Sequence, residues 1–249
     1  MSGHSKWASI KHKKAATDSK RGQAFTRVIR EIQIAARQGG GDAERNSRLR
    51  KAMDNARALN MPKDNIEKAI LRGTGQLEGV NYEELTYEGY GPGGAALLVE
   101  AVTDNKNRTV AEFRHLFSKN AGNLGELGCV SWMFQKKGYI VVPTEGVKED
   151  ELMDIAISAG AEDIQEEEGA FMVYTTPEAF DDVVKALQDA KVPMEDSKVG
   201  KIPQTYVTLA GKEAQQMLRL VSALEDHDDV ENVWNNADIS EEEMEKFSE

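Results

Sequence analysis

The sequence predicts an α+β protein of several domains: an N-terminal three-helix bundle, then two ferredoxin-like α+β plaits, the second inserted in the first. Two observations predict this fold class. Apolar residues recur at helical spacing through the first 75 residues, and short apolar strands alternate with helical segments after them. The later segments follow the order β-α-β, β-α-β-β-α-β and β-α-β, which is one complete plait between the two halves of another.

The charge of the chain changes at the same boundary. The first 75 residues hold 17 Lys and Arg against 7 Asp and Glu, whereas the remainder holds 14 against 36. The net charges are therefore +10 and −22, and the whole chain carries −12. An acidic chain that concentrates its positive charge in one segment has the pattern of a nucleic-acid-binding protein.

The N-terminal segment consists of a basic arm, Gly3–Ser19, and a first helix. In that helix Phe25, Val28, Ile29 and Ile32 form one apolar stripe. The arginines lie on the opposite side, which we expect to face solvent, either as an ordinary solvated face or as a phosphate-binding surface. The predicted nucleic-acid contacts of the whole segment are Lys6, Trp7, Lys11, Lys13, Lys14, Lys20, Arg21, Arg27, Arg30, Arg37 and Arg48.

Two further helices complete the predicted bundle. Gly39–Gly41 ends the first helix, and Asp42 is in a position to cap a second helix over 43–59. Pro62 suits the first turn of a third helix, which stops at Gly73. A three-helix bundle also invites comparison with helix-turn-helix DNA readers. We find no recognition-helix pattern here.

A glycine-containing linker, 75–84, leads to predicted strands at 85–88 and 95–103. The glycines between these strands indicate a turn, because a strand and not a helix N-terminus follows them. We expect a helix beginning at Thr109 and a strand over 130–134. Lys106, Arg108 and Lys119 mark a second basic patch or, equally, a solvated helix face.

The middle of the chain is predicted as an acidic plait. Residues 138–199 hold 4 basic and 16 acidic residues, so a nucleic-acid-binding sheet is not expected there. Tyr139, Phe171 and Tyr174 are instead expected in the core. A strand over 204–209, a helix over 211–225 and a strand over 230–234 follow. The predicted domains are 1–75, 76–136 with 201–238, the inserted 137–200, and an acidic tail, 239–249.

Composition excludes several classes of function. The single cysteine, Cys129, excludes an intramolecular disulfide and a cysteine-cluster zinc site. The chain has no catalytic-serine elbow, zinc-protease motif or Walker lysine, so we expect no enzyme, cofactor, metal site or small-molecule substrate. No stretch is apolar enough to span a membrane, and we expect a cytoplasmic protein.

Several long motifs resemble the YebC family. They are GHSKWASIKHKKAATDSKRGQAFTRVIREI from Gly3, EGYGPGG from Glu88, TDNKNRTVAEFRHLFSKNAGNLG from Thr103, and LEDHDDVENVW near the C-terminus. The resemblance implies a helical domain followed by two α+β domains. It also implies a probable transcriptional regulator, with a mitochondrial relative regarded as a translational activator. Two hypotheses follow: a DNA-binding transcription regulator, or a translation factor that binds ribosomal RNA and the ribosome. The flexible arm and Trp7 favour RNA, whereas the family description favours DNA.

Overall fold

The computed structural model describes residues 18–167 and 169–248. Its N-terminal unit packs three helices: α2 (Asp18–Gly39), α3 (Ser47–Ala58) and α4 (Lys63–Gly73). Their core buries Ile32, Leu49, Met61 and Ile66 with several alanines, and the rest of the predicted apolar stripe, Phe25, Val28 and Ile29, packs partly buried against it. Gly73 permits the close approach of α4 to α2, because a Cβ there would overlap the Gln33 carbonyl.

The start of α3 differs from the prediction. Asn46, not Asp42, caps the helix, since its side-chain oxygen accepts from the Leu49 N–H at 3.0 Å. The amide of Asn46 also donates to the carbonyls of Ala35 (2.7 Å) and Gly40 (2.8 Å), near the end of α2 and just after it. The buried Asn46 side chain therefore ties α3 to the end of α2, and α3 begins later than residue 43.

The first sheet has the strand order β3-β1-β2-β9. Its strands are β1 (Glu83–Tyr90), β2 (Ala96–Thr103), the short β3 (Asn123–Leu124) and β9 (Val230–Asn235). A 3₁₀ turn (η1, Pro92–Gly94) joins β1 to β2. Helices α5 (Lys106–Lys119) and α8 (Gly211–Glu225) cover one face, where Leu97 and Val99 meet Phe113, Phe117 and Met217.

Two predictions in this unit are wrong. Residues 130–134 are not a separate strand: Ser131–Met133 is a 3₁₀ turn (η2), and Phe134 opens a long strand of the other sheet. The buried Glu88 carboxylate enforces the turn by accepting from the N–H groups of Gly128, Val130 and Ser131 at 2.7–2.8 Å. Helix α5 begins at Lys106 with Asn105 as its cap, and Thr109 lies inside it.

The second sheet has the order β5-β6-β4-β7, which is the ferredoxin-like arrangement. It contains β4 (Phe134–Pro143), α6 (Glu149–Ser158), β5 (Ala161–Glu167), β6 (Ala170–Thr175), α7 (Phe180–Asp189) and β7 (Asp196–Pro203). The predicted element order is confirmed. In β4 and β7, Lys137 pairs with Gly200 and Lys136 with Lys201, so the chain enters and leaves this unit at neighbouring positions. The predicted fold class is thus confirmed.

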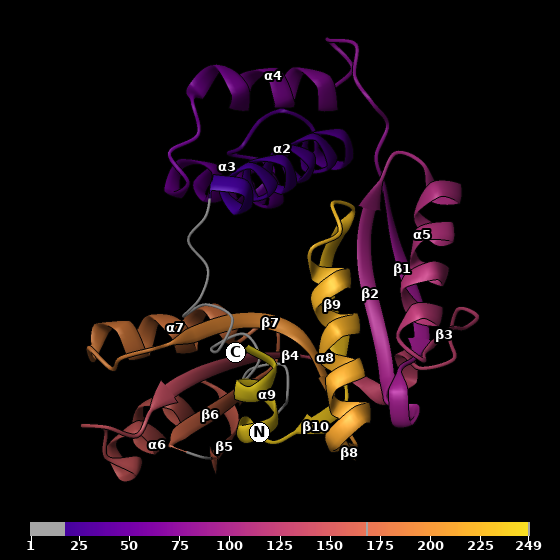
Figure 1. Ribbon diagram of the computed structural model, residues 1–249. Helices are drawn as coiled ribbons and strands as arrows, with labels where there is room; N and C mark the ends of the chain where they lie inside the picture. The colour runs from indigo at the N-terminus through magenta and orange to yellow at the C-terminus, as the bar shows by residue number, and fades with distance from the viewer. Residues whose placement is uncertain (1–17, 168, 249) are drawn as a thin grey trace.

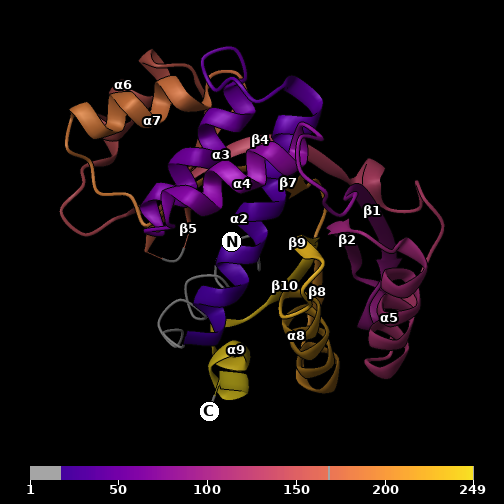
Figure 2. The same cartoon turned by 90° about the horizontal axis from the view of Figure 1, so that it is seen from above.

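The two sheets pack against each other through their helix-free faces. Leu98 and Trp234 of the first sheet meet Tyr139, Met172 and Tyr174 of the second. Helices α5 and α8 therefore lie on one side of the pair and α6 and α7 on the other, with the helical unit across them (Figures 1 and 2). Tyr139, Phe171 and Tyr174 are buried, as expected. The first sheet thus covers Tyr139 and Tyr174 on the helix-free face of the second sheet, whereas Asp163 and Gln165 on the same face of β5 stay exposed.

The C-terminal segment is part of the fold. Strand β8 (Val207–Leu209) pairs in parallel with β10 (Ala237–Ile239), and α9 (Glu241–Ser248) buries Met244 against α8. Acidic residues fill the first turn of α9. The acidic tail predicted from the sequence is therefore a docked helix. Across the described residues, no helix combines the length and apolarity needed to cross a membrane.

Candidate nucleic-acid interface

Two of the predicted contact residues, Arg27 and Arg30 of α2, are docked on another part of the chain. Nη2 of Arg27 donates to the Glu225 carbonyl at 2.8 Å, and Arg30 donates to the Asp228 carbonyl. Arg30 also lies 3.6 Å from a carboxylate oxygen of Asp229, and its side chain is only 11% exposed. The expectation that these guanidinium groups face solvent is wrong, because the loop between α8 and β9 covers them.

The α8–β9 loop, residues 226–229, is suited to hold arginines. Helix α8 ends at Glu225, where the last carbonyls of a helix have no partners within it and carry partial negative charge. Arg27 and Gln23 use two of these positions, the carbonyls of Glu225 and Asp226. The guanidinium of Arg30 lies 5.4 Å from the ring centroid of Tyr82, in cation–π contact. Hydrogen bonds, an ion pair and a cation–π contact therefore hold Arg27 and Arg30 in place.

Asp229 joins the two basic segments that the sequence predicted separately. One carboxylate oxygen faces Arg30 of α2, and the other accepts from Arg108 and Thr109 of α5, each at 2.8 Å. Burial alone would raise the pKa of Asp229, but the hydrogen bonds and the charge of Arg108 outweigh it and lower that pKa. Asp229 is thus an ionised anchor between helices that are distant in sequence.

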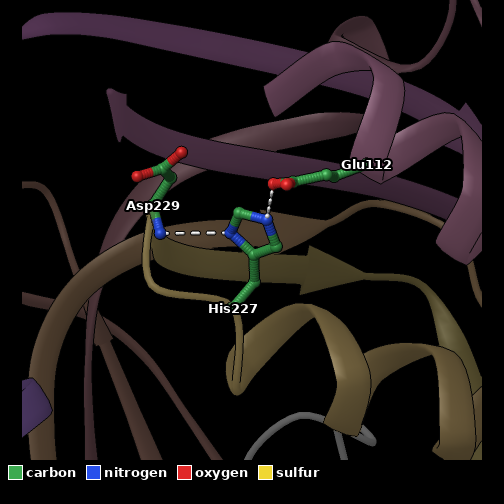
Figure 3. Close-up of side chains that lie close together, drawn as sticks. All are labelled: Glu112, His227 and Asp229. Atoms are coloured by element: carbon green, nitrogen blue, oxygen red, sulfur yellow. Dashed lines mark hydrogen bonds and ion pairs between the residues drawn. The ribbon is translucent and has the colours of Figure 1, made fainter. Parts of the chain in front are cut away.

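Glu112, His227 and Asp229 lie close enough together to suggest a metal site (Figure 3). Their hydrogen bonds explain the cluster without one. The Asp229 N–H donates to Nδ1 of His227 at 3.1 Å, so the proton of a neutral ring is on Nε2, 2.8 Å from Glu112. Asp229 is already bonded to two side chains of α5. We interpret the cluster as a link between α5 and the α8–β9 loop.

An open cleft of about 710 Å³ lies between α2, α5 and the α8–β9 loop. Its walls carry two cations, Arg30 and Arg108, and more carboxylates than cations. Lining residues include Gln23, Arg30, Tyr82, Asp104, Arg108 and Glu112. Because acidic groups outnumber basic ones, the cleft itself does not favour a phosphate backbone.

The other predicted contacts are dispersed. Arg48 is held by Glu31 and Glu84, which raise its pKa further, and Arg37 donates to Asn81 at 2.9 Å. In the second basic patch, Lys106 lies 3.8 Å from Glu83 and Arg108 pairs with Asp104 as well as Asp229, while Lys119 is exposed in the last turn of α5. Outside the described residues lie Lys6, Trp7, Lys11, Lys13 and Lys14, as do the side chains of Lys20 and Arg21.

Exposed positive charge in the described part of the helical unit is found mainly on α3 and α4. Basic side chains there project to solvent from both helices and from the turn before α3. They are Arg45, Arg50, Lys51, Arg57, Lys63, Lys68 and Arg72. Three of them have exposed partners three or four residues away, Arg45 with Asp42, Arg57 with Asp54 and Lys63 with Glu67, and such pairs are weak. This surface remains accessible to a phosphate backbone.

Sequence reasoning missed three groups at the α2 contact: Tyr82, Asp229 and Glu231. The segment LEDHDD carried a signal, since it places acidic residues directly after a predicted helix, where helix carbonyls are unpaired. Glu231 on β9 gives none in the sequence. Burial raises the pKa of its carboxyl to about 7, against the opposing charges of Arg27 and Arg30. In the described part of the chain, one Glu231 oxygen and the Nε atoms of Arg27 and Arg30 are buried without a hydrogen-bond partner.

Comparison with known proteins gives a consistent result over the whole chain. Residues 5–76 match the model of the TACO1/YebC protein N-terminal domain, and 82–237 match that of the TACO1/YebC second and third domain. A probable transcriptional regulatory protein of Desulfatibacillum aliphaticivorans is 59% identical, covering 96% of this chain and 97% of its own. A probable transcriptional regulatory protein of Geobacter sulfurreducens is 58% identical, and the match covers 99% of this chain and 100% of the relative.

A solved structure agrees with the fold. The crystal structure of a conserved hypothetical protein from Aquifex aeolicus superposes with a TM-score of 0.79 at 48% identity. The match covers 93% of this chain and 96% of that one. The arrangement of the helical unit and the two plaits is therefore shared with an experimentally determined relative.

Proposed function

Because the chain belongs to the TACO1/YebC family, whose matched relatives are named probable transcriptional regulatory proteins, we propose that it regulates gene expression by binding nucleic acid through its basic N-terminal segment. The relatives are named as regulators and not as enzymes. Binding of nucleic acid, and the part of the chain that performs it, are the proposed steps.

The observation that carries the proposal is the separation of charge between surfaces. Exposed Lys and Arg side chains lie on α3 and α4, in the same basic N-terminal segment as the arm, whereas the inserted unit is strongly acidic. Nucleic-acid affinity depends largely on the number of phosphates that a protein neutralises. The helical unit would therefore attract the ligand and the acidic unit would repel it from other faces.

We expect phosphate contacts more than base readout. The exposed cations come from two helices and a turn and are scattered over their surfaces, as suits a positioning contact along a backbone. Sequence-specific readout needs several side chains of one element within a groove. Affinity should accordingly vary little with sequence and strongly with salt.

The test is a salt titration of the full chain on RNA and DNA of matched sequence. Arg50 and Lys51 are exposed on α3, so replacing both by Gln should weaken binding to every ligand and reduce the slope of log K against log salt by up to about 2. A matched control replaces Lys185 and Lys212, exposed outside the helical unit, and should leave the slope unchanged. Equal losses in the two double variants would refute an interface on the helical unit.

The nature of the nucleic acid is a second part of the proposal. We expect structured RNA to bind at least as well as duplex DNA, since Trp7 and the basic arm suit irregular single-stranded surfaces. This corresponds to a translation factor that contacts the ribosome, whereas preferential binding of duplex DNA corresponds to direct transcription control. Crosslinking in cells, followed by sequencing of the bound RNA and DNA, distinguishes the two.

A further inference from the structure

The contact between α2 and the α8–β9 loop uses the chemistry of a phosphate contact. Arg27 and Arg30 bind carbonyl oxygens of Glu225 and Asp228, and Arg30 also faces the Asp229 carboxylate. These oxygens carry full or partial negative charge and surround two guanidinium groups. The phosphate oxygens of a nucleic-acid backbone would offer the same kind of contact. In this arrangement the end of α8 and the loop after it occupy Arg27 and Arg30.

The contact is built to separate without disturbing either core. Among the described residues, the apolar core of the helical unit lies within 25–70, and the other three cores lie within 87–247. No apolar cluster joins the helical unit to the rest of that part of the chain. One apolar side chain on this side of α2, Ile34, is buried outside these clusters, beside Tyr82 and Glu84. The other groups of the docking are polar, and such groups exchange partners more readily than an apolar interface does.

The polar groups of this contact are also incompletely satisfied. The Nε atoms of Arg27 and Arg30 and one oxygen of Glu231 are buried without partners in the described residues. Buried polar atoms without hydrogen bonds disfavour the state that contains them. By contrast, contacts near the linker, such as Arg48 with Glu84 and Arg37 with Asn81, are well formed and could persist as a hinge.

We propose that the α8–β9 loop is an internal competitor for the arginine face of α2, so that nucleic acid gains Arg27 and Arg30 only when the helical unit separates from this loop. The inference rests on the proposed function, since it concerns the regulation of the same binding segment. Binding and opening are then coupled, because the ligand has higher affinity for the open state.

The experiment locks the contact closed. In a Cys129→Ser background, Gln23→Cys and Asp226→Cys place thiols on either side of the contact, where the Gln23 amide now lies 3.3 Å from the Asp226 carbonyl. A short bismaleimide joins the two thiols, and the matched control is the same variant with each thiol capped by a monofunctional maleimide. Both forms are titrated with a synthetic RNA hairpin at several salt concentrations.

The proposal expects ready crosslinking and at least about tenfold weaker RNA binding by the locked form. It also expects a salt slope lower by about 1.5, for two lost phosphate contacts. Failure to crosslink, or equal affinities and slopes in locked and capped forms, would overturn the competition while leaving the proposed function intact. Absence of RNA and DNA binding by both forms would overturn the proposed function and this inference together.

Discussion

Replacing Glu231 by Gln should remove a pH dependence of stability that the α2 contact creates. Burial raises the pKa of the Glu231 carboxyl from an ordinary value of 4.5 to about 7. Between these values the folded chain binds a proton that the unfolded chain has released, so stability falls as pH rises through this window. The full difference, from 4.5 to about 7, corresponds to about 3.4 kcal/mol at most, since one pKa unit is about 1.36 kcal/mol.

The free energy of unfolding of the variant should therefore equal that of the wild type at pH 4.5 and exceed it above pH 7. The carboxyls of Glu84, Glu88 and Asp229 do not change stability between pH 5 and 7, because their pKa values are lowered. Their contributions are present above their ordinary pKa values, 4.5 for Glu and 3.8 for Asp, and are lost only as pH falls further. The assay is urea unfolding at closely spaced pH values. Equal pH slopes for wild type and Glu231→Gln between pH 5 and 7 would refute the reasoning.

Three other predictions concern the sheets. Glu88→Gln should lower the free energy of unfolding by about 2–3 kcal/mol, because it removes the charge that binds three N–H groups. It should also speed alkylation of Cys129, whose pKa is raised first by burial and then by the Glu88 charge. An unchanged alkylation rate would contradict this. Gly200→Ala should cost about 1–3 kcal/mol in a thermal melt, since the new Cβ would overlap the Trp234 ring. The control is Gly22→Ala, where the new Cβ meets no atom within 4 Å and no stability should be lost. Replacing 138–200 by a Gly/Ser linker should leave a cooperatively melting remainder that binds a hydrophobic dye at Leu98 and Trp234; a molten remainder would argue against the proposed domain boundaries.

Periodicity and element order predicted most of this fold. The stripe of Ile32 and its neighbours in α2 and the β-α-β-β-α-β order around Tyr139 are local patterns, and the structure contains both. The segment 130–134 resembles a strand in sequence because Val130, Met133 and Phe134 pack between the sheets, but a carboxylate 42 residues before Val130 bends its backbone. No local pattern reports a contact of that kind.

The side of α2 that carries Arg27 and Arg30 shows the same limit of prediction from local sequence. Helical spacing correctly placed Arg27 and Arg30 opposite the apolar stripe, but it could not say what lies against that side. Their partners come from about 200 residues away, and two of the three are main-chain carbonyls, which have no residue identity. Asp229 was visible in the sequence only as one acidic residue among several. Charge alone therefore predicted that Arg27 and Arg30 face solvent, whereas the fold holds them in a contact within the chain.

The most direct test of the central claim compares two fragments with the full chain. Residues 1–75 contain the basic arm and a bundle that closes its own core, and residues 76–249 contain the acidic remainder. On RNA and DNA of matched sequence, the first fragment should bind at least as tightly as the full chain, with log K falling steeply against log salt. The second should bind far more weakly. Comparable affinity of the two fragments would contradict the claim that nucleic acid is bound through the basic N-terminal segment.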